Sequence, residues 1–120
     1  MTLHLTIGQK GEAAAKTYLL EHGYRFVAAN WRCKVGEIDL IMDEDDTRVF
    51  VEVRTRRKTS YGTGDETVAW QKQRKLIRTV QYYQQKEGWW GYVRFDVVSI
   101  TVDHDTKKAR ITHIPYAFDV

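Results

Sequence analysis

The 120-residue sequence has one cysteine, one proline and no long apolar run. The single cysteine, Cys33, excludes an internal disulfide, and the four histidines are too scattered for a zinc site. No segment approaches the roughly 20 apolar residues of a membrane span. The N-terminus lacks the basic flank and apolar core of a signal peptide. We therefore expect a cytoplasmic protein of a reducing compartment, with no membrane partner.

The chain also lacks repeats, low-complexity tracts and any linker that would separate two domains; its one proline is Pro115. A length of 120 residues suffices for one independently folding domain. We expect a single domain over residues 1–120.

The chain carries only a small excess of positive charge, with a formal net charge of +3 and a sequence pI of about 9.0. The cations are clustered, which indicates a polyanionic partner more strongly than the net charge does. One cluster contains Arg54, Arg56, Arg57 and Lys58, and the other contains Lys72, Arg74, Lys75 and Arg78. Each cluster alone is compatible with a solvated surface. Because both adjoin the acidic residues described below, we predict phosphate contacts from Arg56, Arg57, Lys58, Arg74, Lys75 and Arg78.

Hydrophobic periodicity and turn residues predict two helices and five strands. The first helix covers residues 10–22 after a capping box at residues 6–9, and Gly23 ends it. The second helix runs from a capping box at residues 63–66 to Glu87, with a buried stripe of Ala69, Leu76, Val80 and Tyr83. The strands cover residues 24–32, 35–42, 48–54, 91–102 and 109–114, and residues 55–64 form a loop. The order αβββαββ predicts an α/β fold with a mixed central sheet flanked by helices.

Two predicted strands contain carboxylates among apolar and β-branched neighbours, Asp39 in the first and Glu52 in the second. An ionised carboxylate withdrawn from water requires a partner charge, a proton or a metal ion. A hairpin through residues 43–46 would bring these two side chains together. We expect the pair to bind Mg²⁺; ion pairs with Arg32 or Arg94 are the structural alternative.

Other polar residues have simpler interpretations. Glu37 lies at a strand start, where it is expected to orient a loop or to contact a basic group, and Asp96 is expected to form a structural ion pair with Arg94. Trp89, Trp90 and Tyr92 are suited to base stacking or self-association, but packing beside a helix end is favoured for the tryptophans.

Five sequence blocks together resemble a known family. They are Gly11-Glu12 with Ala15, Asn30-Trp31-Arg32, Gly36-Glu37-Ile38-Asp39-Leu40-Ile41, Val49-Phe50-Val51-Glu52-Val53-Arg54-Thr55-Arg56 and Arg94-Phe95-Asp96-Val97-Val98. In this order they resemble the YraN-like family of bacterial proteins. That family is placed in the restriction-endonuclease-like superfamily, together with archaeal Holliday-junction resolvases. The resemblance extends over nearly the whole chain and implies a restriction-endonuclease-like core.

The resemblance also implies a catalytic site. The superfamily signature, an aspartate followed by a glutamate, one residue and a lysine, corresponds here to Asp39 and Glu52-Val53-Arg54, so Arg54 stands where lysine is expected. Glu12 resembles the acid that joins the metal ligands from the first helix, although an exposed glutamate near a helix start is also common. Lys72 lies on the inward stripe of the second helix, where it either replaces the missing lysine or extends its amine to solvent. The implied catalytic residues are Glu12, Asp39, Glu52, Arg54 and Lys72, with Glu12, Asp39 and Glu52 as metal ligands.

Two functions follow as expectations. The first is a nuclease that hydrolyses phosphodiester bonds in DNA, branched or single-stranded, with Mg²⁺ as cofactor and Mn²⁺ as its substitute. The second is a non-catalytic nucleic-acid-binding module that retains the nuclease fold, because arginine stays charged and cannot exchange a proton with the attacking water. DNA is favoured over RNA as partner, and a homodimer is compatible with the sequence. A third interpretation is a protein-interaction domain that uses the aromatic surface near Trp89.

Overall fold

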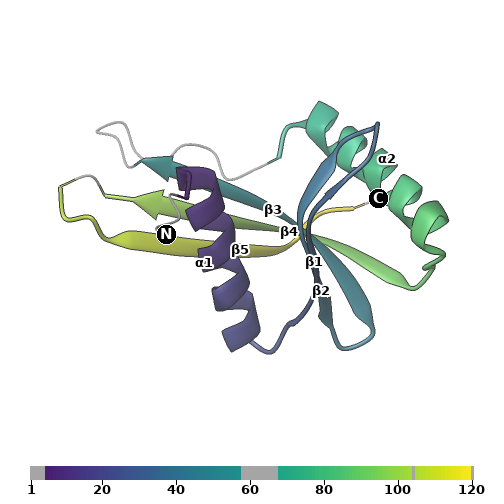
Figure 1. Ribbon diagram of the computed structural model, residues 1–120, viewed down its shortest axis with the longest axis horizontal. Coiled ribbons are helices and arrows are strands. Elements are labelled where there is room, and N and C mark those ends of the chain that lie inside the picture. The colour runs from purple at the N-terminus through teal and green to yellow at the C-terminus, as the bar shows by residue number, and fades with distance from the viewer. Residues whose placement is uncertain (1–4, 58–67, 104, 120) are drawn as a thin grey trace.

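The computed structural model describes residues 5–57, 68–103 and 105–119. The described chain forms two helices and one five-stranded sheet (Figure 1). In chain order the elements are α1 (Ile7–Glu21), β1 (Arg25–Arg32), β2 (Glu37–Glu44), β3 (Thr47–Arg57), α2 (Trp70–Glu87), β4 (Tyr92–Val102) and β5 (Ala109–Phe118). The predicted order αβββαββ is confirmed. Neither helix of the described chain is both long and apolar enough to cross a membrane.

The strands lie in the sheet in their sequence order, β1-β2-β3-β4-β5. The pairs β1–β2, β2–β3 and β4–β5 are antiparallel, whereas β3 and β4 are parallel. Parallel neighbours require a crossover connection, and α2 lies in that connection. The predicted mixed α/β sheet is therefore confirmed.

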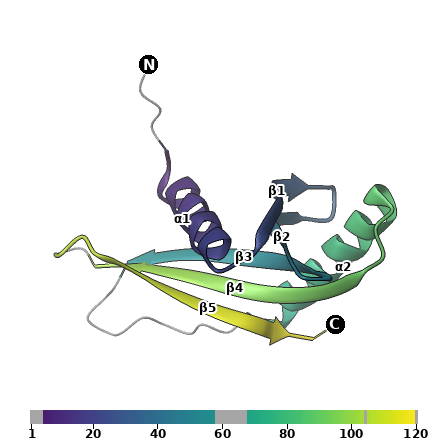
Figure 2. The ribbon, with the colours of Figure 1, turned by 90° about the horizontal axis from the view of Figure 1, so that it is seen from below.

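The two helices pack on opposite faces of the sheet. Phe50 of β3 packs in the same cluster as Leu76 and Val80 of α2, whereas the next residue, Val51, packs with Leu19 of α1. Because successive strand residues point to opposite faces, these contacts assign one face to each helix. In Figure 2, α1 lies over β3, β4 and β5, and α2 lies towards the end of the sheet where β1 and β2 rise.

The start of α1 follows from its capping residues. The Thr6 hydroxyl accepts a hydrogen bond of 3.1 Å from the Gln9 amide, and the Gln9 side chain accepts one of 2.9 Å from the Thr6 amide. This capping box, as predicted, satisfies two amides that would otherwise lack partners. The helix begins at Ile7, three residues before the predicted start, and Gly23 adopts a φ of 87° just beyond its end.

The start of α2 differs from the prediction. Residues 63–66, the predicted capping box, lie outside the described residues, and Val68 and Ala69 are not helical. Val68 is buried in the core, and Ala69 caps the helix with an extended ψ of 145°. Ala69 is also exposed, so its predicted place in the buried stripe is wrong, whereas Leu76, Val80 and Tyr83 are buried as expected.

Strand β3 is longer than the sequence indicates. Residues 55–57, predicted as loop, continue β3 and pair with β4 from Thr55–Ile100 to Arg57–Val102. The neighbouring parallel strand supplies backbone hydrogen bonds to a segment whose polar composition is typical of a loop. The first basic cluster therefore lies partly on a strand, where alternate side chains point to opposite faces.

Candidate functional site

Strands β2 and β3 separate at Asp39. The two strands are paired from Glu44 of β2 opposite Thr47 of β3 to Leu40 opposite Val51, and the pairing ends there. Beyond this point β2 stays paired with β1 as far as Glu37, and β3 stays paired with β4. The sheet thus opens between its second and third strands directly beside Asp39 and Glu52.

The Asp39 side chain lies in this opening. Its Oδ2 accepts a hydrogen bond of 2.9 Å from the backbone N–H of Val53. The carboxylate thus satisfies a backbone donor of β3 that the separating strand β2 no longer pairs. Continuing the β2–β3 register by one residue places Asp39 opposite Glu52. The hairpin consequently brings the two predicted carboxylates to one place, as the spacing indicates.

Helix α2 adds a cation to these acids. The Lys72 ammonium forms an ion pair with Oε1 of Glu52, whose side chain is 10% exposed, whereas that of Lys72 is 49% exposed. Lys72 is therefore held at the acids and does not simply extend into solvent. A cleft of about 220 Å³ contains this group. Its lining residues are Gly36, Glu37, Asp39, Glu52, Lys72, Lys75, Leu76 and Thr79.

Gly36 allows the loop before β2 to approach α2 closely. A Cβ at this position would lie 2.8 Å from Oγ1 of Thr79 and 3.3 Å from a side-chain carbon of Lys75. The first distance is too short for carbon beside oxygen, so any larger residue would push the loop away from the helix. The glycine in the Gly36-Glu37 block therefore sets the width of the cleft.

The electrostatics of the cleft centre on Asp39. The pKa of Asp39 is raised to about 7, chiefly by burial; the hydrogen bond from Val53 opposes this rise, and the charges of Glu52, Glu12 and Glu37 add to it. Glu12, on α1, is thus close enough for its charge to act on Asp39. A carboxylate with a pKa near neutrality is poorly compensated by its surroundings, which is a common property of functional sites.

The donor set permits a specific kind of metal site. Among the described residues, no three His, Cys, Asp or Glu side chains are grouped closely enough to bind a metal ion by themselves. Mg²⁺, however, is usually bound through one or two carboxylates, completed by waters and substrate phosphates. Asp39 and Glu52 fit that pattern because both are oxygen donors at the opening and Asp39 is undercompensated. Glu12 is near this pair, but it is not close enough to form a group of three metal-binding side chains with Asp39 and Glu52.

The basic residues separate into two regions. Lys75 lines the cleft beside Lys72, and Arg78 is exposed one turn further along α2. The Arg74 guanidinium lies 5.8 Å from the ring centroid of Trp70, which is exposed. Arg56 and Arg57 line a second hollow on the other side of β3, and Lys58 lies outside the described residues. Arg54 is half-buried and pairs through its backbone position with Ser99 of β4.

Arg32 and Arg94, the alternative ion-pair partners of Asp39 and Glu52, form ion pairs with other acidic residues. Arg32 pairs with Glu37 at 2.9 Å on the surface, so the expected basic partner of Glu37 is present. Arg94 pairs with Asp96 and with Glu44. Trp89 packs at the edge of the core with the Arg48 guanidinium 4.5 Å from its ring, as favoured, whereas Trp90 is exposed.

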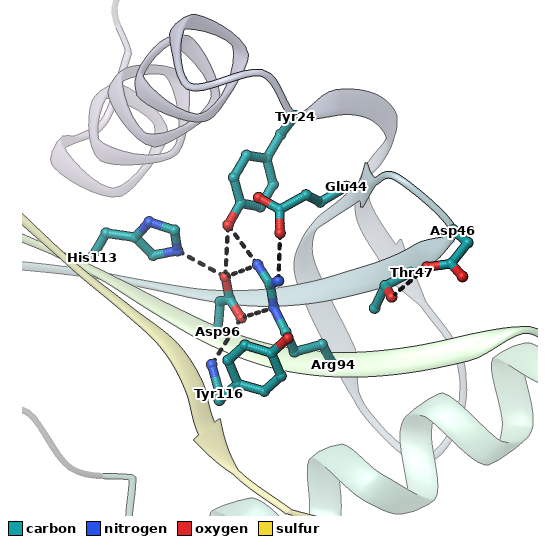
Figure 3. A network of polar contacts seen from close by, with 8 residues as sticks. All are labelled: Tyr24, Glu44, Asp46, Thr47, Arg94, Asp96, His113 and Tyr116. Atoms are coloured by element: carbon teal, nitrogen blue, oxygen red, sulfur yellow. Dashed lines mark hydrogen bonds and ion pairs between the residues drawn. The ribbon is translucent and has the colours of Figure 1, made fainter.

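The Arg94–Asp96 ion pair belongs to a larger buried network (Figure 3). Two guanidinium nitrogens donate to the two carboxylate oxygens at 2.8 and 2.9 Å, and His113 Nε2 lies 2.7 Å from Oδ2. The Tyr24 hydroxyl and the Glu44 carboxylate also contact Arg94. Burial acts to raise the pKa of Asp96, but the hydrogen bonds from His113 and Arg94 outweigh it and hold that pKa below its usual value. The Arg94 pair is confirmed, whereas Tyr24, Glu44 and His113 carry no local sequence signal that identifies them as partners.

Comparison with known proteins gives a consistent family assignment. The family described as "Uncharacterised protein family UPF0102" matches residues 11–100. A UPF0102 protein of Rhodococcus opacus is 42% identical over 119 residues, covering 98% of this chain and 100% of the relative. UPF0102 proteins of Pseudomonas fluorescens and Moorella thermoacetica are each 41% identical, covering 97% and 92% of this chain and 95% and 93% of the relatives. The chain belongs to the UPF0102 family.

Proposed function

We propose that this protein is a Mg²⁺-dependent nuclease that hydrolyses phosphodiester bonds in DNA, on a restriction-endonuclease-like core. The observation that carries the proposal is the pair of carboxylates at the opening between β2 and β3, with the pKa of Asp39 raised to about 7. An undercompensated Asp39 beside Glu52, in a cleft that also contains two lysines, matches the requirements of phosphodiester hydrolysis.

The residues divide the chemistry as follows. Asp39 and Glu52 hold the metal, which when bound acts as a Lewis acid and lowers the pKa of a coordinated water. Lys75 attracts the phosphate to the cleft, and Lys72 is positioned to leave Glu52 and stabilise negative charge on the phosphoryl oxygens. Glu12 adds negative charge near Asp39 and so strengthens cation binding. Arg54, two residues from Glu52 on β3, remains cationic and stabilises the anionic transition state.

The fold supports this assignment. The mixed sheet carries the acids on adjacent antiparallel strands, and α1 contributes Glu12 from the other side of the opening. This arrangement agrees with the site that the sequence resemblance implies. The preference for DNA over RNA rests on the sequence resemblance.

A second candidate is the non-catalytic nucleic-acid-binding module. Two observations favour it: arginine occupies position 54, and the Lys72 ammonium already neutralises Glu52. If this ion pair persists with nucleic acid bound, one of the two metal ligands is lost. The protein would then bind phosphates without cleaving them.

A cleavage assay tests the proposal. Labelled branched, flapped, single-stranded and duplex DNA, with RNA counterparts, are incubated with Mg²⁺ or Mn²⁺, and we expect cleavage of at least one DNA substrate. Asp39→Asn should abolish it because the variant removes a ligand while preserving an acceptor for the Val53 amide. Asp45→Asn is the matched control, since it makes the same change at an exposed residue outside the cleft whose φ of 52° asparagine tolerates. Equal cleavage by wild type and Asp39→Asn would contradict the proposed site.

Metal binding is measured separately by thermal unfolding. A cation that binds the folded protein but not the unfolded chain raises the melting temperature, and it does so more strongly the more tightly it binds. We expect Mn²⁺ to raise the melting temperature of wild type and not that of the double variant Asp39→Asn with Glu52→Gln. The same metal response in both proteins would exclude these carboxylates as the ligands.

A further inference from the structure

A second and larger hollow lies on the face of the sheet that α1 covers. It is bounded by α1, by the ends of β3 and β4 and by the start of β5, and its volume is about 520 Å³. Ligand cavities in proteins typically measure roughly 300–1,000 Å³. Its wall is mainly apolar, formed by Ile7, Ala14, Ile100, Val102 and Ala109.

The rim of this hollow is basic. Lys10 of α1, Arg56 and Arg57 of β3 and Lys107 before β5 contribute four cations, against a single carboxylate from Asp103. An apolar wall beside a cationic rim complements a molecule with a flat apolar part and an anionic part. A nucleotide combines both, because every base has an apolar π-face and every linkage carries a phosphate.

The hollow lies next to the acidic cleft along two elements. Gly11, in its wall, directly precedes Glu12, whose charge acts on Asp39. Thr55, also in its wall, follows Glu52 by three residues of β3, which at the rise of a strand corresponds to about 10 Å. Glu52 and Thr55 are an odd number of residues apart and point to opposite faces of β3, so a polynucleotide strand contacts both places by passing through the opening between β2 and β3 at Asp39.

The close approach of α1 to β3 maintains this geometry. A Cβ added to Gly11 would lie 2.0 Å from Oγ1 of Thr55, so only glycine allows the helix this near to the strand. The hollow opens beside this contact, towards the first turns of α1. Its shape is thus fixed by the backbone.

We propose that this hollow binds the base of an unpaired nucleotide next to the position that the acidic cleft attacks, while its basic rim holds the adjoining phosphate. The inference rests on the proposed function for a polynucleotide partner, but it requires no cleavage. A base within a duplex is stacked and paired and cannot enter such a hollow without being extruded. The site therefore selects nucleic acid with a single-stranded element over a continuous duplex.

Equilibrium binding without divalent metal tests this site independently of catalysis. A fluorescently labelled single-stranded oligonucleotide and the continuous duplex of the same sequence are titrated in the presence of a chelator. We expect wild type to bind the single strand about tenfold more tightly, because burial of a base face against the apolar wall contributes on that scale. Ala14→Leu, which fills the hollow, should abolish the preference while leaving duplex binding unchanged.

Matched variants separate the hollow from general effects on α1 and on charge. Ala13→Leu makes the same change at an exposed neighbouring position outside the hollow and should behave as wild type. Lys107→Asn removes a rim cation at a residue whose φ of 57° asparagine tolerates, and it should weaken single-strand binding more than Lys108→Asn does. Melting temperatures confirm that each variant is folded.

Three results would overturn the proposal. They are equal affinity of wild type for single strand and duplex, equal losses in Ala14→Leu and Ala13→Leu, and displacement of the single strand by an anionic lipid such as laurate as effectively as by a mononucleotide. The last result would assign the hollow to a lipid. A failed cleavage assay with the expected binding pattern would reject the enzyme and retain this site.

Discussion

The Asp39 carboxylate accepts a hydrogen bond of 2.9 Å from the backbone amide of Val53, on the strand that β2 is leaving. The Asp39 side chain thus takes the place of a backbone carbonyl of β2 as the acceptor for the Val53 amide, at the point where the sheet opens. This role fixes the orientation of Asp39, and it also explains why burial of the carboxylate is tolerated. Asp39 and Glu52 both line the same cleft.

The raised pKa of Asp39 predicts how stability changes with pH. Folding raises this pKa from an ordinary value near 3.8 to about 7, so the folded protein holds the proton more tightly than the unfolded chain. The contribution of this proton to stability is complete below pH ~4 and is lost as the pH rises towards 7, and it amounts to roughly 2–4 kcal/mol. Asp39→Asn should therefore be more stable than wild type at pH 8 by about that amount.

Urea unfolding at pH 4 to 8 measures this difference. The free energies of unfolding of wild type and Asp39→Asn should converge as the pH falls towards 4, because the aspartate then becomes neutral too. Asp45→Asn is the control, since Asp45 is exposed at the turn between β2 and β3, lies outside the cleft and has a φ of 52° that asparagine tolerates. A difference between wild type and Asp39→Asn that does not vary with pH would contradict the raised pKa.

The buried network around Asp96 predicts a large structural effect without a catalytic one. Asp96→Asn removes one of the two counter-charges of the Arg94 guanidinium, which is 5% exposed and then retains only Glu44, and breaking a buried pair in this way typically costs about 3–5 kcal/mol. Asp43→Asn is the matched control because Asp43 forms an equivalent pair with Arg48 nearer to the surface. Urea unfolding at pH 7 should show a clearly smaller loss for Asp43→Asn. Similar losses in both variants would show that the network adds nothing to a simple ion pair.

Much of this architecture follows from local sequence patterns. The alternation in β2 and β3 and the short connection between them identify Asp39 and Glu52 as neighbours, because a tight hairpin fixes which residues face each other. The capping box of α1 is likewise readable from four residues. Both features depend on interactions between residues close in sequence.

The features that the sequence did not predict depend on contacts with residues that are distant in the sequence. Residues 55–57 resemble a loop and become strand because β4, about 45 residues later, offers a parallel partner. His113 carries no local signal of its contact with Asp96, and it reaches that carboxylate only because β5 pairs with β4. The hollow beside Gly11 requires α1, β3, β4 and β5 together. Tertiary pairing, which local propensity does not encode, decides each of these.

The cations of α2 predict the salt dependence of nucleic-acid binding. Lys75 lines the cleft and Arg78 is exposed near it, so the double variant Lys75→Ala with Arg78→Ala should weaken binding. Each lost phosphate contact should reduce the slope of log affinity against log salt by roughly 0.7–0.9. Lys86→Ala, at the other end of the same helix, is the control and should leave the slope unchanged. An unaltered slope in the double variant would reject this end of α2 as the binding surface.

Arg54 provides the test that separates the nuclease from the binding module. A lysine there presents a compact charge that approaches an attacking water, whereas the broader guanidinium competes for its space or binds the phosphate without promoting attack. We expect Arg54→Lys to retain the fold and to cleave faster than wild type with Mg²⁺, and Arg54→Ala to lose whatever activity exists. Arg110→Lys, the same exchange at an exposed residue of β5 that lines neither the cleft nor the second hollow, should cleave at the wild-type rate.

The outcomes of this experiment differ for each function. Wild-type cleavage that drops in Arg54→Lys would show that arginine is the adapted residue and that its guanidinium takes part directly in stabilising the phosphate. Absence of cleavage in both proteins, with nucleic-acid binding intact, would favour the non-catalytic module. In that case the Lys72–Glu52 ion pair, which occupies one of the two acids, accounts for the inactivity. Lys72→Met should then restore the melting-temperature response to Mn²⁺, because it frees Glu52 to act as a ligand beside Asp39.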